Sequence, residues 1–263
     1  MLRWFEHRQV YQPSRFSFAT GSELGRPFEN VFFHTRDNVR LHGWFFPANA
    51  NSPRAALALL FCHGNGGNIC HRLQTAQALL ATGLNVFLFD YRGYGQSQGR
   101  PSEEGTYVDG MAAYEWLRQK GFAGCSILLY GESLGGGVAA ELGLRLETAG
   151  LILQSTFTSL PALGAELFPW LPVQRLARIR YDTLRKLPQF KRPVLILHSP
   201  QDELVAFHHA QQNFAAGLQP KLLWEIKGRH NDPLADTNLF ITGIEQFLRL
   251  IEPPKTNVNP HRV

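Results

Sequence analysis

The sequence predicts an α/β fold built on a mostly parallel sheet. Short apolar runs recur along the chain, and helical stretches separate the later ones. Strands that are buried on both faces of a parallel sheet have continuous apolar sequences, and a helix usually connects one such strand to the next. A serine flanked by glycines, where one apolar run passes directly into a helical stretch, is the third indication.

Eight segments of the chain are predicted to be strands. The first two, 30–35 and 40–46, resemble an antiparallel hairpin joined through Arg36, Asp37 and Asn38. The later segments have continuous rather than alternating apolar sequences, which is typical of parallel strands covered on both faces. They span residues 55–61, 85–89, 126–130, 150–153, 193–198 and 221–226.

Helices are expected at residues 68–81, 103–119, 134–146, 206–216 and 232–250. The second is the best defined, because Ser102 is a favourable N-cap and Glu103 and Glu104 suit the first turn. Its apolar face comprises Tyr107, Met111, Tyr114 and Leu117. This alternation predicts a doubly wound sheet, in which ligands bind beyond the carboxyl ends of the strands.

The interval 155–191 differs from the rest of the chain. It contains several apolar residues and prolines but no clear strand. Because it is too long for a simple connection and too short for a domain, we predict a small lid.

Residues 252–263 contain three prolines and little apolar content, and we predict a flexible tail. The length of 263 residues suits one domain with a large core.

Composition describes an ordinary globular protein, with 44% hydrophobic and 18% charged residues. No apolar stretch reaches the length of a membrane span, and the N-terminus lacks the features of a signal peptide. We therefore expect a cytoplasmic protein. The N-terminal residues are interpreted as an arm packed over the domain. The alternative is an interfacial anchor formed by Leu2, Trp4 and Phe5, which leaves peripheral membrane contact open.

The net charge of +5 is mildly basic, and the basic residues are scattered except in 175–192. No stacking aromatics interleave with that cluster, so a solvated face is favoured and no nucleic-acid partner is expected. The cluster could still attract anionic substrates or a membrane surface.

The three cysteines, Cys62, Cys70 and Cys125, lack metal-ligand spacing and cannot all pair. We expect no metal, no cofactor and a reducing compartment.

Residues 131–135, Gly-Glu-Ser-Leu-Gly, match the nucleophile elbow pattern G-x-S-x-G. To aim its hydroxyl outward, the serine of an elbow adopts a backbone angle that side chains usually forbid. The flanking turns pack so closely that only glycine fits at positions 131 and 135. Ser133 is therefore the candidate nucleophile, and a chance match in a glycine-containing loop is the alternative.

A serine hydroxyl needs a base within hydrogen-bond reach, and the base needs an orienting acid. Of the ten histidines, His230 lies between the last strand and the last helix, which places it at the carboxyl edge of the sheet. Asp202 follows the strand 193–198 and lies at the same edge. Glu203 is an alternative acid, whereas Asp232 is interpreted as a helix cap because a proline follows it.

A tetrahedral oxyanion requires two preorganised N–H donors. We expect one to be the backbone N–H of Leu134, which follows the nucleophile. The other is expected from the loop 63–68, His-Gly-Asn-Gly-Gly-Asn, where glycines let the backbone approach a substrate, and the N–H of Asn65 is our choice. His63 is interpreted as structural. A phosphate cradle is the alternative for this loop, but no Gly-Lys-Ser/Thr follows it.

The segments HGNGGNI, DYRGYGQS, GESLGG and GRHN resemble those of the α/β-hydrolase superfamily, in which the triad order Ser133, Asp202, His230 also occurs. More narrowly, they are similar to α/β-hydrolase-domain serine hydrolases related to protein depalmitoylases. The resemblance implies an α/β-hydrolase fold with an eight-stranded sheet, that triad, and structural roles for Asp90 and Arg92. Many relatives carry an N-terminal membrane segment, and the depalmitoylases carry a lipid-bearing cysteine cluster. This chain has neither, so depalmitoylation is not carried over.

The leading hypothesis is a serine hydrolase that cleaves a small-molecule or lipid-like acyl ester or thioester through an acyl-enzyme. Phe157, Phe168 and Trp170 suggest an apolar acyl pocket, although the inner face of a lid must be apolar in any case. A serine peptidase or amidase is the first alternative, because the same triad cleaves amides. A non-catalytic binding protein on a hydrolase scaffold is the second, and loss of a triad residue would favour it.

Overall fold

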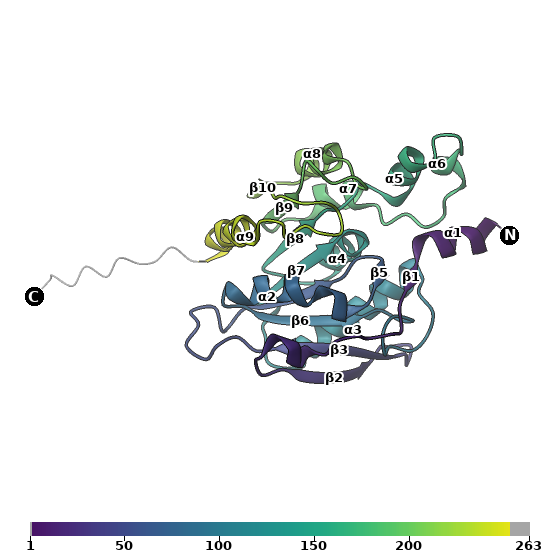
Figure 1. The fold of residues 1–263 in the computed structure, drawn as a ribbon. Helices are drawn as coiled ribbons and strands as arrows, with labels where there is room; N and C mark the ends of the chain where they lie inside the picture. Colours follow the sequence, from purple (N-terminus) through teal and green to yellow (C-terminus); the bar gives the residue numbers. More distant parts are fainter. Residues whose placement is uncertain (1, 253–263) are drawn as a thin grey trace, which may run out of the picture.

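A central eight-stranded sheet organises residues 2–252, the part of the chain that this computed structural model describes (Figure 1). The spatial order of its strands is β10-β9-β8-β7-β4-β6-β3-β2. β3 runs antiparallel to both β2 and β6, and the other neighbours are parallel, so the mostly parallel eight-stranded sheet is confirmed. The strands are β2 (Glu29–His34), β3 (Arg40–Phe46), β4 (Ala58–Cys62), β6 (Asn85–Asp90), β7 (Ile127–Glu132), β8 (Gly150–Gln154), β9 (Val194–His198) and β10 (Lys221–Glu225).

Helices cover both faces of this sheet (Figure 1). The described helices are α1 (Leu2–Val10), α2 (Leu73–Ala81), α3 (Glu103–Gln119), α4 (Leu134–Arg145), α5 (Leu160–Leu167), α6 (Val173–Leu176), α7 (Thr183–Lys186), α8 (Phe207–Ala216) and α9 (Thr237–Ile251). Short 3₁₀ turns occur at Gly21–Leu24, Ile69–Arg72, Gly124–Ser126 and Leu187–Gln189. A separate two-stranded parallel pair joins β1 (Gln12–Pro13) to β5 (Gly66–Gly67).

Two apolar cores flank the sheet. α3, α4 and α8 enclose the first core, and α2 and α9 enclose the second. The consecutive residues Leu128 and Leu129 of β7 point into opposite cores, and both are fully buried. This arrangement explains the continuous apolar sequences of the parallel strands, because both faces of each strand are covered.

The predicted start of the last helix is wrong. α9 begins at Thr237, where the Asp236 side chain accepts a hydrogen bond from the Leu239 N–H at 3.0 Å. Asp232 lies before the cap residue Asp236, and its own N–H donates to the Arg229 carbonyl at 3.1 Å and closes a turn. The predicted helix 68–81 is likewise divided into a 3₁₀ turn and α2. The N-cap role of Ser102 in α3 is confirmed.

The segment 155–191 contains short helices and no strand, as expected. Its first two helices, α5 and α6, stand beside the strand-helix body at the upper right of Figure 1. This segment also contains an exposed indole, because 74% of Trp170 is accessible to solvent. Its role as a lid stays a prediction.

The N-terminal segment forms α1 and is tied to the body of the protein. The Glu6 carboxylate accepts hydrogen bonds from the backbone N–H groups of Arg178 and Ile179, at 2.7 and 3.0 Å. The His7 ring donates to the Pro101 carbonyl at 2.8 Å. The side chains of the suggested anchor residues Leu2, Trp4 and Phe5 lie outside the described residues, as do residues 253–263 of the expected tail. No helix in the described range is long and apolar enough to cross a membrane.

Candidate active site

Ser133 occupies a sharp turn between β7 and α4. Its backbone angles, φ 51° and ψ −116°, lie outside the regions that residues with a side chain prefer, as the elbow pattern predicts. The Ser133 N–H donates to the Gln154 carbonyl at 2.8 Å, which holds the turn against the end of β8. The surrounding structure therefore stabilises a strained conformation, which is characteristic of functional sites.

The glycines on either side of Ser133 are required by close backbone approach. A Cβ atom at Gly131 would lie 2.4 Å from the Cα atom of Gly136, and one at Gly135 would lie 2.0 Å from the Cys62 carbonyl oxygen. Both distances are far below van der Waals contact. The prediction that glycine alone fits these two positions is confirmed.

The three predicted triad residues lie together at the carboxyl edge of the sheet, after β7, β9 and β10. The Ser133 Oγ atom lies 3.0 Å from Nε2 of His230. The Nδ1 atom of His230 lies 2.8 and 3.0 Å from the two carboxylate oxygens of Asp202. An ionised carboxylate only accepts hydrogen bonds, so Nδ1 carries the proton and Nε2 is left to accept from the serine hydroxyl.

Asp202 is held as an anion by its surroundings. Burial by itself would raise the pKa of this carboxyl, but the hydrogen bond and charge of His230 and the Val205 N–H outweigh it and leave the pKa below its ordinary value. Oδ1 accepts hydrogen bonds from the N–H groups of Leu204 and Val205, at 3.0 and 2.8 Å. These bonds fix the carboxylate plane toward the imidazole.

Two residues that sequence reasoning did not place in the triad support its geometry. The Glu203 carboxylate accepts a hydrogen bond from the His230 backbone N–H at 3.1 Å, so it holds the histidine loop rather than the ring. The buried His198 ring donates from Nε2 to the Val205 carbonyl at 2.7 Å and lies 3.5 Å from Asp202. No local sequence signal marks His198, because its contacts depend on how the turn after β9 folds back.

The two N–H groups expected to bind an oxyanion are available. Leu134 is the first residue of α4, and its N–H has no acceptor within the helix. Within residues 2–252, neither this N–H nor that of Asn65 donates to another protein group. The side chain of Asn65 accepts from the Gln12 N–H at 2.9 Å and from the Tyr94 hydroxyl at 3.4 Å, which positions the glycine-rich loop.

The residues interpreted as structural make framework contacts. The Asp90 carboxylate accepts from the Ile69 N–H at 2.9 Å, and Arg92 pairs with the buried carboxylate of Asp109 at 2.8 Å. His63 is fully buried, and this burial lowers its pKa to about 3, with a further contribution from the nearby arginine. A ring that remains neutral and enclosed is poorly suited to proton transfer with a substrate.

The three aromatic residues predicted to line a substrate pocket do not form one cluster. Phe157 is 2% exposed and belongs to the first apolar core. Phe168 and Trp170 contact each other edge to face, with ring centroids 5.8 Å apart. Because Phe157 is enclosed by core residues, only the Phe168–Trp170 pair has a ring exposed to solvent in this conformation.

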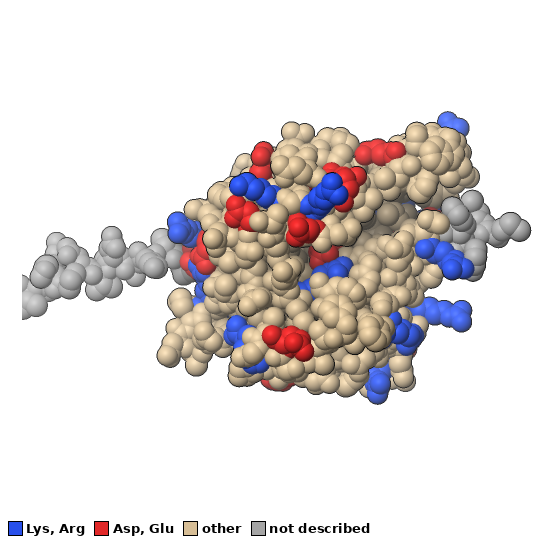
Figure 2. All heavy atoms as spheres, in the orientation of Figure 1, with Lys and Arg blue, Asp and Glu red and all other residues tan. Residues whose placement is uncertain are grey.

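Cavity size alone does not locate the site. A cavity of about 80 Å³ lies beside His230 and is also lined by Arg72 and Glu132, which form an ion pair at 2.8 Å. A larger cleft of about 610 Å³ is lined partly by Asn49 and Gly83, which precede β4 and β6. That cleft therefore lies near the amino edge of the sheet, opposite the triad. Acidic and basic side chains are interspersed on the face shown in Figure 2.

The amino-acid sequence matches known proteins over most of its length. The family model described as "Serine aminopeptidase, S33" matches residues 52–181. The chain is 38% identical to protein Rv2307c of Mycobacterium tuberculosis, an alignment that covers 94% of this chain and 89% of that protein. It is 33% identical to the alpha/beta hydrolase domain-containing protein WAV2 of Arabidopsis thaliana, with 97% and 91% covered.

Solved structures share the fold. The esterase Pf2001 of Pyrococcus furiosus superposes with a TM-score of 0.74 at 21% identity, covering 92% of this chain and 97% of that one. An alpha-beta hydrolase from Vibrio vulnificus superposes with a TM-score of 0.76 at 20% identity, covering 94% and 93%. At these identities the likeness establishes the architecture alone.

Proposed function

The chain belongs to the α/β-hydrolase family, and on this premise we propose that it is a serine hydrolase that cleaves carboxylic esters or thioesters. One observation carries the proposal: a continuous line of hydrogen-bond contacts runs from Ser133 Oγ through the His230 ring to the Asp202 carboxylate. A serine held at the carboxyl edge by a strained elbow, with a base in contact and an acid behind it, is the arrangement that activates a hydroxyl.

The reaction follows from the proton positions. His230 Nε2 accepts the Ser133 proton as Oγ attacks the acyl carbon, and Asp202 stabilises the imidazolium. The backbone N–H groups of Leu134 and Asn65 donate to the oxyanion. As the tetrahedral adduct collapses, the imidazolium gives its proton to the departing alcohol or thiol, which leaves an acyl-serine. His230 then takes a proton from water, the resulting hydroxide attacks the acyl carbon, and the proton returns to Ser133 Oγ as the carboxylic acid leaves.

We propose that the substrate is a small-molecule or lipid-like acyl ester or thioester, whose acyl group is transferred to Ser133. The exposed Trp170 and the half-buried Phe168 beside it offer apolar surface on the 155–191 segment. Movement of the segment would be needed for contact with a long acyl chain, because the cavity of about 80 Å³ beside His230 is smaller than ordinary ligand pockets.

A serine peptidase or amidase is the second candidate. The matched family model, described as a serine aminopeptidase, specifically favours it. The binding-protein alternative has less support, because all three triad residues are present and in contact.

The test is labelling with a fluorophosphonate probe, followed by mass spectrometry of the adduct. We expect the wild-type protein to be labelled at Ser133, and labelling to fall by about a thousandfold or more in Ser133→Ala and His230→Ala. Ser22→Ala, which removes an exposed serine elsewhere, is the matched control and should label normally. Folded protein that is not labelled, or labelling that is indifferent to His230, would favour the binding-protein reading.

Substrate class is then decided by comparing esters, thioesters and aminoacyl amides with the same acyl group. Turnover of esters or thioesters that depends on Ser133 supports the proposal. Faster turnover of the amides would replace it with the peptidase alternative. A series of acyl chain lengths measured with Trp170→Ala tests the role of the exposed Trp170 ring, because only long chains should lose rate.

A further inference from the structure

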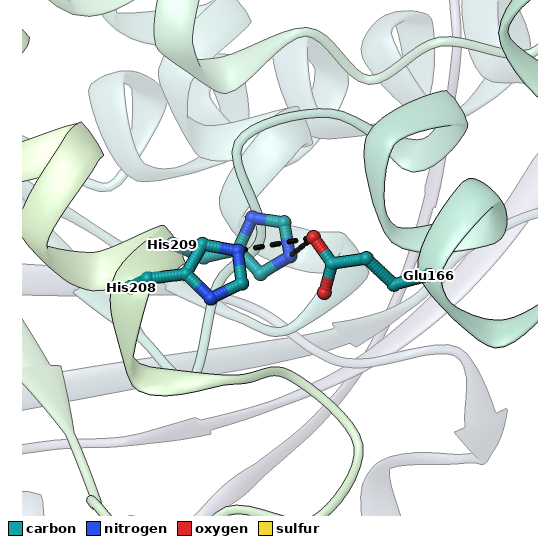
Figure 3. Close-up of side chains that lie close together, drawn as sticks. All are labelled: Glu166, His208 and His209. Carbon is teal, nitrogen blue, oxygen red and sulfur yellow. Dashed lines mark hydrogen bonds and ion pairs between the residues drawn. The ribbon is translucent and has the colours of Figure 1, made fainter.

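A cluster of two histidines and a glutamate lies outside the triad, between two helices. Glu166 comes from α5, and His208 and His209 are consecutive residues of α8. Figure 3 shows the carboxylate directed toward both rings. Glu166 Oε1 lies 3.0 Å from Nε2 of His208 and 3.3 Å from Nε2 of His209.

Two of the three distances between the candidate ligand atoms fit a metal coordination shell. Imidazole nitrogens and carboxylate oxygens bind Zn²⁺ at about 2.0–2.2 Å, so two ligands at a tetrahedral angle lie about 3.3 Å apart. The two distances to Glu166 Oε1, 3.0 and 3.3 Å, are close to that value. The three candidate ligand atoms also lie within 4.8 Å of one another.

A second observation points to a ligand at this position. The His209 side chain is 1% exposed, and its Nε2 atom is buried without a hydrogen-bond partner among the described residues. The contact with Glu166 has ion-pair distance but lacks hydrogen-bond geometry. Leaving such an atom unsatisfied is unfavourable, so its place beside a carboxylate and a second imidazole requires an explanation.

Thr158 contacts the other side of the His209 ring. Its backbone N–H donates to Nδ1 at 3.2 Å, and its hydroxyl lies 2.9 Å from the same atom. A neutral ring whose Nδ1 accepts this bond carries its proton on Nε2, so coordination of a cation at Nε2 requires the proton to move to Nδ1, where the Thr158 hydroxyl can accept it.

We propose that Glu166, His208 and His209 bind a divalent transition-metal ion of the zinc class. The ion joins α5, in the segment 155–191, to α8, which follows the turn that carries Asp202. Glu166 and His208 are 40% and 44% exposed, so water completes the coordination shell. The expectation of no metal rested on cysteine spacing, which carries no information about Glu166 and His208, 42 residues apart in the chain.

The test is a zinc titration of untagged, chelator-treated protein, followed by calorimetry. We expect one ion per chain in the wild type. Glu166→Gln and His208→Gln should each weaken zinc affinity by at least about tenfold. Both positions are on the surface, so these variants avoid the folding risk of changing His209. His34→Gln, which removes another exposed histidine, is the matched control and should keep wild-type affinity.

Two further measurements use the same variants. Cobalt in place of zinc should give the visible absorption of tetrahedral Co²⁺ in the wild type and in His34→Gln only. Zinc should raise Tm in those two proteins and not in Glu166→Gln. Zinc affinity that is unchanged by both ligand substitutions, or absence of stoichiometric binding, would overturn the proposal. Neither result depends on whether Ser133 is a nucleophile.

Discussion

Replacement of Gly135 by alanine tests the packing that holds the elbow in place. The added Cβ atom would lie 2.0 Å from the Cys62 carbonyl oxygen and 2.6 Å from that of His63. Both neighbours are backbone atoms of the strand β4 and the loop that follows it, and they cannot rotate away as a flexible side chain can. The N-terminus of α4 must therefore separate from β4.

The cost follows from the displacement. Relief of a 2.0 Å contact requires a movement of more than about 1 Å, since non-bonded atoms settle near 3.5 Å. Overpacking of a core costs about 1–3 kcal/mol, and we expect the upper end here because the obstacle is buried backbone. The movement also displaces Ser133 and the Leu134 N–H, and a misplacement of about 1 Å can lower a rate by about 100-fold.

Urea denaturation measures the first effect, and the rate of fluorophosphonate labelling measures the second. We expect Gly135→Ala to lose about 3 kcal/mol in the free energy of unfolding with an unchanged m-value. Gly217→Ala is the matched control, because its Cβ atom would meet only atoms at 3.7 Å or more, and its φ is −68°. It should change stability by less than about 0.5 kcal/mol. Equal unfolding midpoints for the two variants would refute the packing argument.

Three further predictions concern buried groups. His63, with a pKa lowered to about 3 by burial, should keep its neutral NMR shift down to about pH 4. Its stabilising contribution is complete above the unfolded pKa of about 6.5 and should decline as pH falls toward 3, whereas a titration near pH 6 would contradict the burial. The exposed thiol of Cys125 should react with a disulfide reagent at pH 8 in the folded protein. Cys62, whose thiol pKa burial raises to about 12, should react only after unfolding, and rapid native modification would count against this. Arg92→Leu leaves the fully buried Asp109 carboxylate without its cation and should cost about 3–5 kcal/mol in chemical denaturation. A second substitution, Asp109→Leu, should recover part of that loss, and additive effects would show that the pair is not coupled.

Much of the fold could be predicted because its signals are local. The run 126–130 reads as a strand buried on both faces, and β7 spans Ile127–Glu132 with leucines pointing into opposite cores. The start of α9 could not be predicted in this way. An Asp-Pro pair is a common helix start, but at Asp232 the backbone is engaged in a turn that brings His230 to the serine.

The sequence by itself determined the elbow and the edge of the sheet at which Ser133, Asp202 and His230 would lie. Parallel strands present their carboxyl ends at one edge, so a residue directly after a strand is placed by that rule without knowledge of the strand order. Tertiary structure alone decided which distant side chains meet. Phe157 entered the core instead of joining Phe168, and Glu166 reached His208 across 42 residues. Such contacts depend on how helices dock, and no local pattern encodes that.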